Sequence, residues 1–104
     1  MEESVFLPLL ALHSYPRLTP KARLQPDRVT GELALLYPEG VLMLNPTGAA
    51  ILELCDGQHT ILEVATTLAE QYGVTPEEIT PDVIEYLDRL HVKRLIELHN
   101  EANS

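Results

Sequence analysis

The chain has 104 residues, of which 45% are hydrophobic and 22% are charged. This length fits a single domain with one modest core, because chains divide into several domains only well beyond about 250 residues. The composition is that of a folded globular domain and excludes global disorder. No apolar run reaches the roughly 18 residues that a membrane helix requires, and the acidic start of the chain lacks the basic region of a secretory signal. We therefore expect no membrane contact and a cytoplasmic location.

The charges are distributed unevenly along the chain. Sixteen Asp and Glu residues oppose seven Lys and Arg residues, which gives a formal net charge of −9. Between Glu32 and Asp88 the chain contains eleven acidic residues and no Lys or Arg. A surface that binds nucleic acid requires basic side chains along the phosphate backbone. The acidic block therefore argues against nucleic acid as a partner.

The beginning of the chain is rich in proline and has no regular hydrophobic period. We predict that residues 1–20 form an extended apolar arm. The side chains that would dock this arm are Val5, Phe6, Leu7, Leu9, Leu10 and Leu12. Its own domain, a partner or a second copy of the chain could receive it, so the arm is compatible with a homodimer.

Three strands are predicted in the first half of the chain. Residues 21–25 alternate between polar and apolar side chains, which is the period of a half-buried strand. Pro26-Asp27 is typical of a turn, and residues 32–37 form the second strand. Pro38-Glu39-Gly40 is typical of a hairpin loop, so residues 41–44 return as the third strand. All four residues of that strand are apolar, so both of its faces need cover.

Three helices are predicted in the second half. The first begins at Asn45, an N-cap residue followed by proline, and ends before Gly57, a left-handed cap. The second occupies residues 60–73, with a capping box at its start and a helical apolar stripe. The third begins with another capping box at Thr75. Pro81 lies inside the third helix and either kinks or restarts it.

The predicted fold class is α+β. It is a winged-helix-like arrangement of a three-stranded antiparallel sheet followed by a three-helix layer, and the last two helices form a helix-turn-helix. Residues 92–98 either prolong the last helix or form a short strand. The domain is expected to span residues 21–98, and residues 99–104 are expected to fray.

No catalytic or metal-binding constellation is evident. The four histidines (13, 59, 91 and 99) lack the spacing of metal ligands on one helix face. Cys55 falls on a core-facing stripe, and the predicted helix end separates it from His59, so we interpret it as a small hydrophobic residue rather than a nucleophile. Glu53 and Asp56 are interpreted as solvated carboxylates. The sequence therefore predicts a protein that is not an enzyme, holds no metal and requires no cofactor.

The helix-turn-helix makes a DNA-binding regulator the alternative that fold alone suggests. The helix that would enter the major groove carries acidic residues throughout and a basic residue only near its end: Glu77, Glu78, Asp82, Glu85, Asp88 and Arg89. Phosphate repulsion makes this alternative the weaker one.

The third strand is the clearest binding feature. It lies at the edge of the predicted sheet, where backbone N–H and C=O groups remain open. Ile84 lies off the core stripe of the last helix and would line the same apolar groove. Such an edge can receive a peptide as an additional strand, with backbone bonds giving affinity and pockets giving selection. The competing occupants are the N-terminal arm and a second copy of the chain.

Three stretches together resemble the PqqD family of small peptide chaperones in pyrroloquinoline quinone biosynthesis. They are Leu35-Leu36-Tyr37-Pro38-Glu39-Gly40-Val41, then Leu44-Asn45, then Ile51-Leu52-Glu53-Leu54-Cys55-Asp56-Gly57. Arg23-Leu24-Gln25 before them, and Asp82-Val83 and Tyr86-Leu87 after them, also fit. The resemblance covers residues 16–92.

The resemblance implies a peptide-recognition domain of a ribosomally made, modified-peptide pathway. Such a domain binds the leader of a precursor peptide by strand addition and presents it to a radical S-adenosylmethionine enzyme, without chemistry of its own. The residues that would contact the peptide are Val41, Leu42, Met43 and Leu44 on the strand and Ile84, Leu87, Asp88 and His91 on the helix. The alternatives are recognition in a related modified-peptide pathway and a subunit that only stabilises its enzyme partner.

Overall fold

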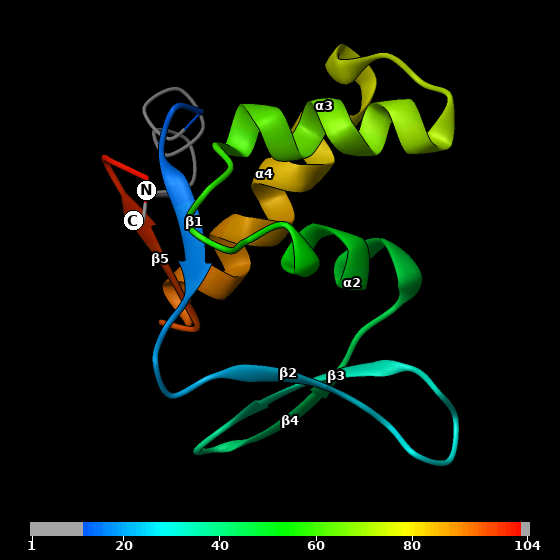
Figure 1. The fold of residues 1–104 in the computed structure, drawn as a ribbon, viewed down its shortest axis with the longest axis vertical. Helices are drawn as coiled ribbons and strands as arrows, with labels where there is room; N and C mark the ends of the chain where they lie inside the picture. The colour runs from blue at the N-terminus through cyan, green and yellow to red at the C-terminus, as the bar shows by residue number, and fades with distance from the viewer. Residues whose placement is uncertain (1–11, 103–104) are drawn as a thin grey trace.

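The computed structural model describes residues 12–102, and the element labels are those of Figure 1. Four strands come first: β1 (Tyr15–Leu18), β2 (Arg23–Pro26), β3 (Leu33–Tyr37) and β4 (Gly40–Met43). They are followed by the helices α2 (Pro46–Glu53), α3 (Ile61–Tyr72) and α4 (Pro76–Val92), and then by β5 (Ile96–His99). Within this part of the chain, no helix is long and apolar enough to cross a membrane.

The predicted three-stranded antiparallel sheet is present, with β3 between β2 and β4. The hairpin register pairs Tyr37 with Gly40, so Pro38 and Glu39 form the two-residue turn between β3 and β4. Among residues 12–102, β4 pairs with β3 alone and is therefore an edge strand of this sheet.

A second, two-stranded sheet joins the two ends of the described chain. β1 pairs antiparallel with β5, with Leu18 opposite Ile96. Residues 15–18, predicted as part of an extended arm, form the first of these strands. The first eleven residues of that arm lie outside the described part. Residues 92–98 were predicted either to prolong the last helix or to form a short strand. Both alternatives are partly confirmed, because the helix reaches Val92 and a strand begins at Ile96.

Pro26 is the last residue of β2 and not part of a turn, which corrects the sequence-based expectation. The reason lies in the hydrogen-bond register. Asp27 N–H donates to Glu32 C=O at 2.7 Å, and backbone groups alternate in direction along an antiparallel strand. The nitrogen of Pro26 therefore faces away from β3, where a missing N–H costs no ladder bond.

The predicted N-caps of all three helices and the glycine cap that ends α3 are confirmed. Asn45 accepts a bond from Gly48 N–H at 2.7 Å and caps α2. Thr60 and Thr75 each form a complete capping box with a glutamate three residues later. Gly73 ends α3 in the left-handed conformation, with φ of 70°, which glycine adopts without steric strain.

Two helix features differ from the expectation. Helix α2 ends at Glu53, with Leu54 as its right-handed C-cap, so Gly57 lies beyond the helix rather than at its cap. Helix α4 is continuous through Pro81. The proline removes one helical N–H, but the carbonyl that loses its donor belongs to Glu77, an exposed residue that water can reach.

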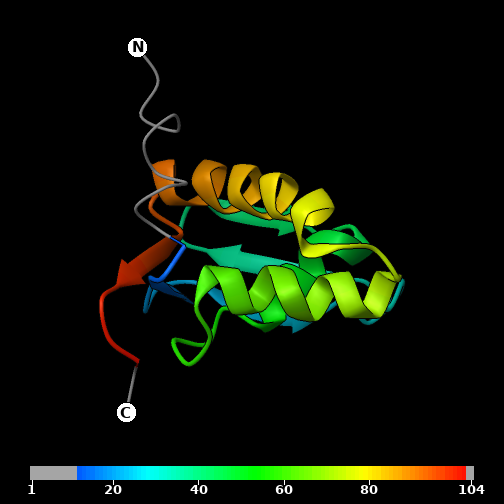
Figure 2. The same ribbon diagram turned by 90° about the horizontal axis from the view of Figure 1, so that it is seen from above.

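All three helices lie on one side of the three-stranded sheet (Figure 1). Seen from above, α3 and α4 lie beside one another over that sheet, and they pack together (Figure 2). The core between the layers contains the fully buried side chains of Leu35, Ile51, Leu52, Ile61, Leu68 and Leu87. The opposite face of the sheet is not covered by any element within residues 12–102.

Candidate functional site

The free backbone groups of β4 can be assigned from one hydrogen bond. Leu44 N–H donates to Leu33 C=O at 3.0 Å, which continues the β3–β4 register by one pair. Residues of an antiparallel strand direct their backbone groups alternately toward and away from the partner. Leu42 therefore bonds to β3, whereas the N–H and C=O groups of Val41 and Met43 face the open edge.

The opposite edge of the sheet is less suited to accept a strand. On β2 the outward-facing residues are Leu24 and Pro26, by the same alternation. Pro26 has no N–H to donate, and proline on an edge strand discourages further pairing. Within the described chain, β4 is thus the edge with a complete set of donors and acceptors.

The side chains of β4 divide between the two faces of the sheet. Val41 and Met43 lie on the outer face and are 59% and 46% exposed. Leu42 lies on the helix side, opposite Leu35, and is 36% exposed. Leu44 follows the strand and is 5% exposed, so it belongs to the core. A guest strand beside β4 would extend both faces and cover Val41, Leu42 and Met43.

The four residues predicted on the helix do not form one exposed surface. Leu87 is 1% exposed and packs in the core. Asp88 is buried, and Ile84 and His91 are half-buried. The cavity nearest the C-terminal end of β4 is lined by a different face of α4.

This cavity measures about 470 Å³ and lies between α2, the end of α3 and α4. Helix α4 contributes Glu78, Ile79, Asp82, Val83, Glu85, Tyr86 and Arg89 to its wall. The guanidinium of Arg89 lies over the Tyr86 ring, 5.7 Å from its centroid, at cation–π distance. The sequence analysis did not predict this cavity, because it used Asp82 and Glu85 as an argument against DNA binding and cited Asp82 and Tyr86 only for the family resemblance.

A second cavity of about 750 Å³ lies at the hairpin end of β4. It is lined by the turn before β2, the β3–β4 hairpin and the residues after α4: Thr19, Pro20, Lys21, Tyr37, Pro38, Glu39, Lys93, Arg94, Leu95 and Glu97. The residues just before β4 thus share a cavity with residues 93–97, which follow α4, and those just after β4 share one with residues 78–89 of α4. Helix α4 therefore spans the length of β4 in the opposite direction.

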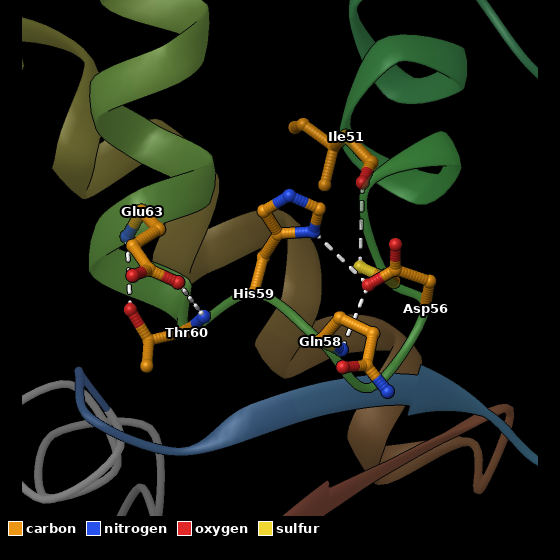
Figure 3. Close-up of polar contacts among 7 residues, drawn as sticks. Ile51, Asp56, Gln58, His59, Thr60 and Glu63 are labelled. Atoms are coloured by element: carbon orange, nitrogen blue, oxygen red, sulfur yellow. Dashed lines mark hydrogen bonds and ion pairs between the residues drawn. The ribbon is translucent and has the colours of Figure 1, made fainter. Parts of the chain in front are cut away.

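The stretch Cys55-Asp56-Gly57 is structural (Figure 3). Asp56 Oδ1 accepts bonds from Gln58 N–H at 2.8 Å and from His59 Nδ1 at 3.0 Å. Partial burial alone would raise the pKa of Asp56, but these bonds outweigh it and lower the pKa below its ordinary value. Gly57, with φ of 79°, donates its N–H to Pro16 C=O and so ties this loop to β1.

Cys55 is buried in the core, and its thiol is unreactive. Its thiol donates to Ile51 C=O at 3.3 Å (Figure 3). Burial, and to a lesser extent the Asp56 carboxylate, raises the pKa of Cys55 to about 12. A thiol with this pKa is protonated at neutral pH and is a poor nucleophile. Within residues 12–102, no group of three His, Cys, Asp or Glu side chains could hold a metal ion.

Comparisons of the sequence place it among known proteins. The profile of coenzyme PQQ synthesis protein D (PqqD) matches residues 32–96. The PqqA binding protein of Methylococcus capsulatus is 44% identical over 71 residues, which cover 68% of this chain and 74% of that protein. The PqqA binding protein of Xanthomonas euvesicatoria is 37% identical over 86 residues, covering 83% and 94%.

Solved structures agree with the sequence comparison. One match is the solution structure of the PqqD truncation of Methylobacterium extorquens PqqCD. It is described as a stand-alone recognition element of a ribosomally synthesised and modified peptide. The TM-score is 0.68 and the identity is 35%, and the match covers 79% of this chain and 87% of that one. The crystal structure of PqqD from Xanthomonas campestris matches with a TM-score of 0.54 and 37% identity, covering 78% and 90%. The chain therefore belongs to the PqqD family.

Proposed function

We propose that this chain is a peptide chaperone of pyrroloquinoline quinone biosynthesis. It binds the precursor peptide PqqA by adding the leader as a strand along β4, and it presents the bound precursor to a radical S-adenosylmethionine enzyme. Relatives that match most of this chain are named for binding PqqA, and a matching structure is described as a recognition element.

The observation that carries the proposal is the open edge of β4. Two backbone N–H groups and two C=O groups, those of Val41 and Met43, face outward beside exposed apolar side chains. Such an edge supplies sequence-independent backbone bonds, and the flanking side chains supply selection. The eight residues predicted from the sequence, 41–44 with Ile84, Leu87, Asp88 and His91, remain our proposed region of contact. Within it, Leu44 and Leu87 are core side chains that would support the groove from below. The cavity wall adds Asp82 and Tyr86.

We further propose that the chain performs no chemistry and uses no cofactor. The Cys55 thiol is buried and protonated, and the relatives are named as binding proteins. The bond-forming steps then belong to the partner enzyme. Binding of a precursor and an enzyme that modifies it is expected to take place in the cytoplasm.

Backbone-amide NMR with a PqqA precursor peptide from the same genome tests the proposal. We expect the largest shifts at residues 40–45 and 82–91, together with slowed hydrogen exchange at Val41 and Met43, because their N–H groups gain partners. Shifts confined to residues outside β4 and α4 would overturn the site. A salt-sensitive shift of duplex DNA, or binding to the enzyme without binding to the precursor, would instead favour the alternatives.

Of the two competing occupants, the N-terminal arm and a second copy of the chain, the second copy can be tested by its mass. Light scattering of the free and the precursor-bound protein distinguishes a second copy from the peptide. A monomer in both states supports the peptide as the occupant. A free dimer that dissociates when precursor is added would show that the two compete for β4.

A further inference from the structure

The two ends of the open edge carry opposite charge. The inference drawn from these charges rests on the proposed function, because it concerns how the bound peptide is oriented. The cavity at the C-terminal end of β4 is lined by α4 and by the residues that follow β4. The cavity at the hairpin end is lined by the residues that follow α4 and by those that precede β4. The residues directly after and directly before β4 line these two cavities, so we expect a peptide longer than the four residues of β4 to reach both.

The cavity at the C-terminal end of β4 is acidic. Three carboxylates, those of Glu78, Asp82 and Glu85, line it against one guanidinium, that of Arg89. Glu85 is paired with Arg89 at 3.8 Å, and Glu78 accepts the Thr75 N–H at 3.2 Å. Asp82 has no ion pair or hydrogen bond with any side chain within residues 12–102. An exposed carboxylate beside an apolar floor, which includes half-exposed tyrosine and valine side chains, suits a lysine or arginine with its aliphatic stem.

The cavity at the hairpin end is basic. Lys21, Lys93 and Arg94 line it, so three of the seven basic residues of a chain with net charge −9 meet at one place. Its acidic members are Glu39 and Glu97. Glu97 is already paired with Arg17 at 3.4 Å and with His99 at 2.9 Å. Among the remaining charged side chains of this cavity, one carboxylate (Glu39) faces three basic groups. This end suits a carboxylate of the guest.

We propose that these charged ends fix the direction and register of the bound precursor. Antiparallel addition, which continues the pattern of the sheet, places the N-terminal side of the guest segment at the acidic cavity and its C-terminal side at the basic one. The edge therefore selects a peptide with a Lys or Arg before the strand-forming segment and an Asp or Glu after it. The part of the precursor that follows the leader then leaves the domain beside Lys93 and Arg94.

Paramagnetic labels on the precursor test the direction. A nitroxide is attached to the synthetic PqqA precursor immediately before, or immediately after, the segment whose amides become protected on binding. The label before the segment is expected to broaden the amides of residues 45–48 and 82–86. The label after it is expected to broaden those of residues 38–39 and 93–94. The reverse pattern, or equal broadening at both ends by each label, would overturn the proposal.

Charge reversal tests the selection. Asp82→Lys and Lys93→Glu are each expected to weaken precursor binding roughly three- to tenfold at low salt, with a smaller effect at high salt. Glu70→Lys and Arg23→Glu change exposed charges that line neither cavity and are the matched controls; their dissociation constants should stay within about twofold. Thermal unfolding by circular dichroism confirms that all four variants fold.

A compensating precursor completes the design. Replacing its basic residue before the segment by Glu should weaken binding to the wild-type chain and restore binding to Asp82→Lys. Two results would overturn the proposal that charged ends orient the precursor but leave the proposed function intact. The first is that amide shifts appear along β4 although neither charge reversal changes the affinity. The second is that the precursor has no basic residue before the segment. If the precursor does not bind at all, the proposed function itself fails.

Discussion

The hydroxyl of Tyr86 on α4 lies so close to Gly48 on α2 that a Cβ at position 48 would be 2.5 Å from Tyr86 Oη and 2.8 Å from Cζ. Gly48 is buried within the first turn of its helix, where its N–H also bonds to the Asn45 side chain. The absence of a side chain at this position therefore lets α4 approach α2. Both residues line the acidic cavity, so this contact sets its inner wall.

Gly48→Ala is expected to lower the free energy of unfolding by about 1 kcal/mol. Overpacking against Tyr86 costs about 1–3 kcal/mol, and the better helix propensity of alanine offsets about 1 kcal/mol of that. In a Tyr86→Phe background the loss should shrink, because the nearest atom is gone. Urea unfolding of the four proteins of this cycle measures the coupling, and an equal loss in both backgrounds would show that the contact is not the cause.

Met43→Pro and Leu42→Pro form a matched pair along β4. Met43 N–H faces the open edge, so its loss should leave the fold intact and abolish precursor binding. Leu42 N–H bonds to β3, so the same change one residue earlier should lower stability by about 1–3 kcal/mol or more. Calorimetry and thermal unfolding separate the two effects. Undiminished binding by a folded Met43→Pro variant would contradict strand addition at this edge, and Met43→Ala, which keeps the N–H, serves as the control.

Gly73→Ala isolates a backbone effect. Gly73 has φ of 70°, and a Cβ there would meet no atom within 4 Å. Since no other part of the described chain would touch this Cβ, we expect the free energy of unfolding to fall by about 1 kcal/mol. The cause is the local cost of placing an L-residue in the left-handed region. Gly73→Asn should lose less, because asparagine tolerates that region better. Denaturant unfolding gives both values, and equal losses for Ala and Asn would argue against this cause.

The pH dependence of stability should contain a contribution from Asp56. Its pKa in the folded chain is lower than the ordinary value of 3.8, because the bonds from Gln58 and His59 outweigh partial burial. A group with a depressed folded pKa contributes stability above its unfolded pKa, and this is lost as the pH falls through the folded pKa. Asp56→Asn should therefore be less stable than the wild type near neutral pH, and the difference should shrink below about pH 3.8. A difference that stays constant from neutral to acidic pH would contradict this assignment.

Local chemistry allowed much of the fold to be predicted from the sequence. The capping boxes at Thr60 and Thr75 and the glycine that ends α3 are satisfied by groups within a few residues, so their signals do not depend on the rest of the chain. The hairpin at Pro38 and Glu39 is local for the same reason. The strand after it is apolar at every position, which predicted that both of its faces need cover. Within the described chain its outer face stays exposed at Val41 and Met43.

The helix side of the site could not be obtained in this way. Periodicity identifies which residues of α4 share a face, but it does not say which neighbouring element that face meets. The sequence predicted Ile84, Leu87, Asp88 and His91 as contacts, and these remain a proposal. It gave no sign that Asp82 and Tyr86 line the cavity beside the residues that follow β4. Only the tertiary structure shows which residues of α4 line that cavity.

By itself, the sequence determined where the three helices begin, where α3 ends, the hairpin, the absence of basic residues from the middle of the chain and the family. The tertiary structure decided the pairing of β1 with β5, where Arg17 and Glu97 meet from positions 80 residues apart. It also decided that the proline of β2 belongs to a strand, that Met43 rather than Leu42 offers its N–H, and that opposite charges collect at the two ends of β4. The physical reason is that these features depend on register and on contacts between distant segments, whereas local patterns encode only the conformation of each segment.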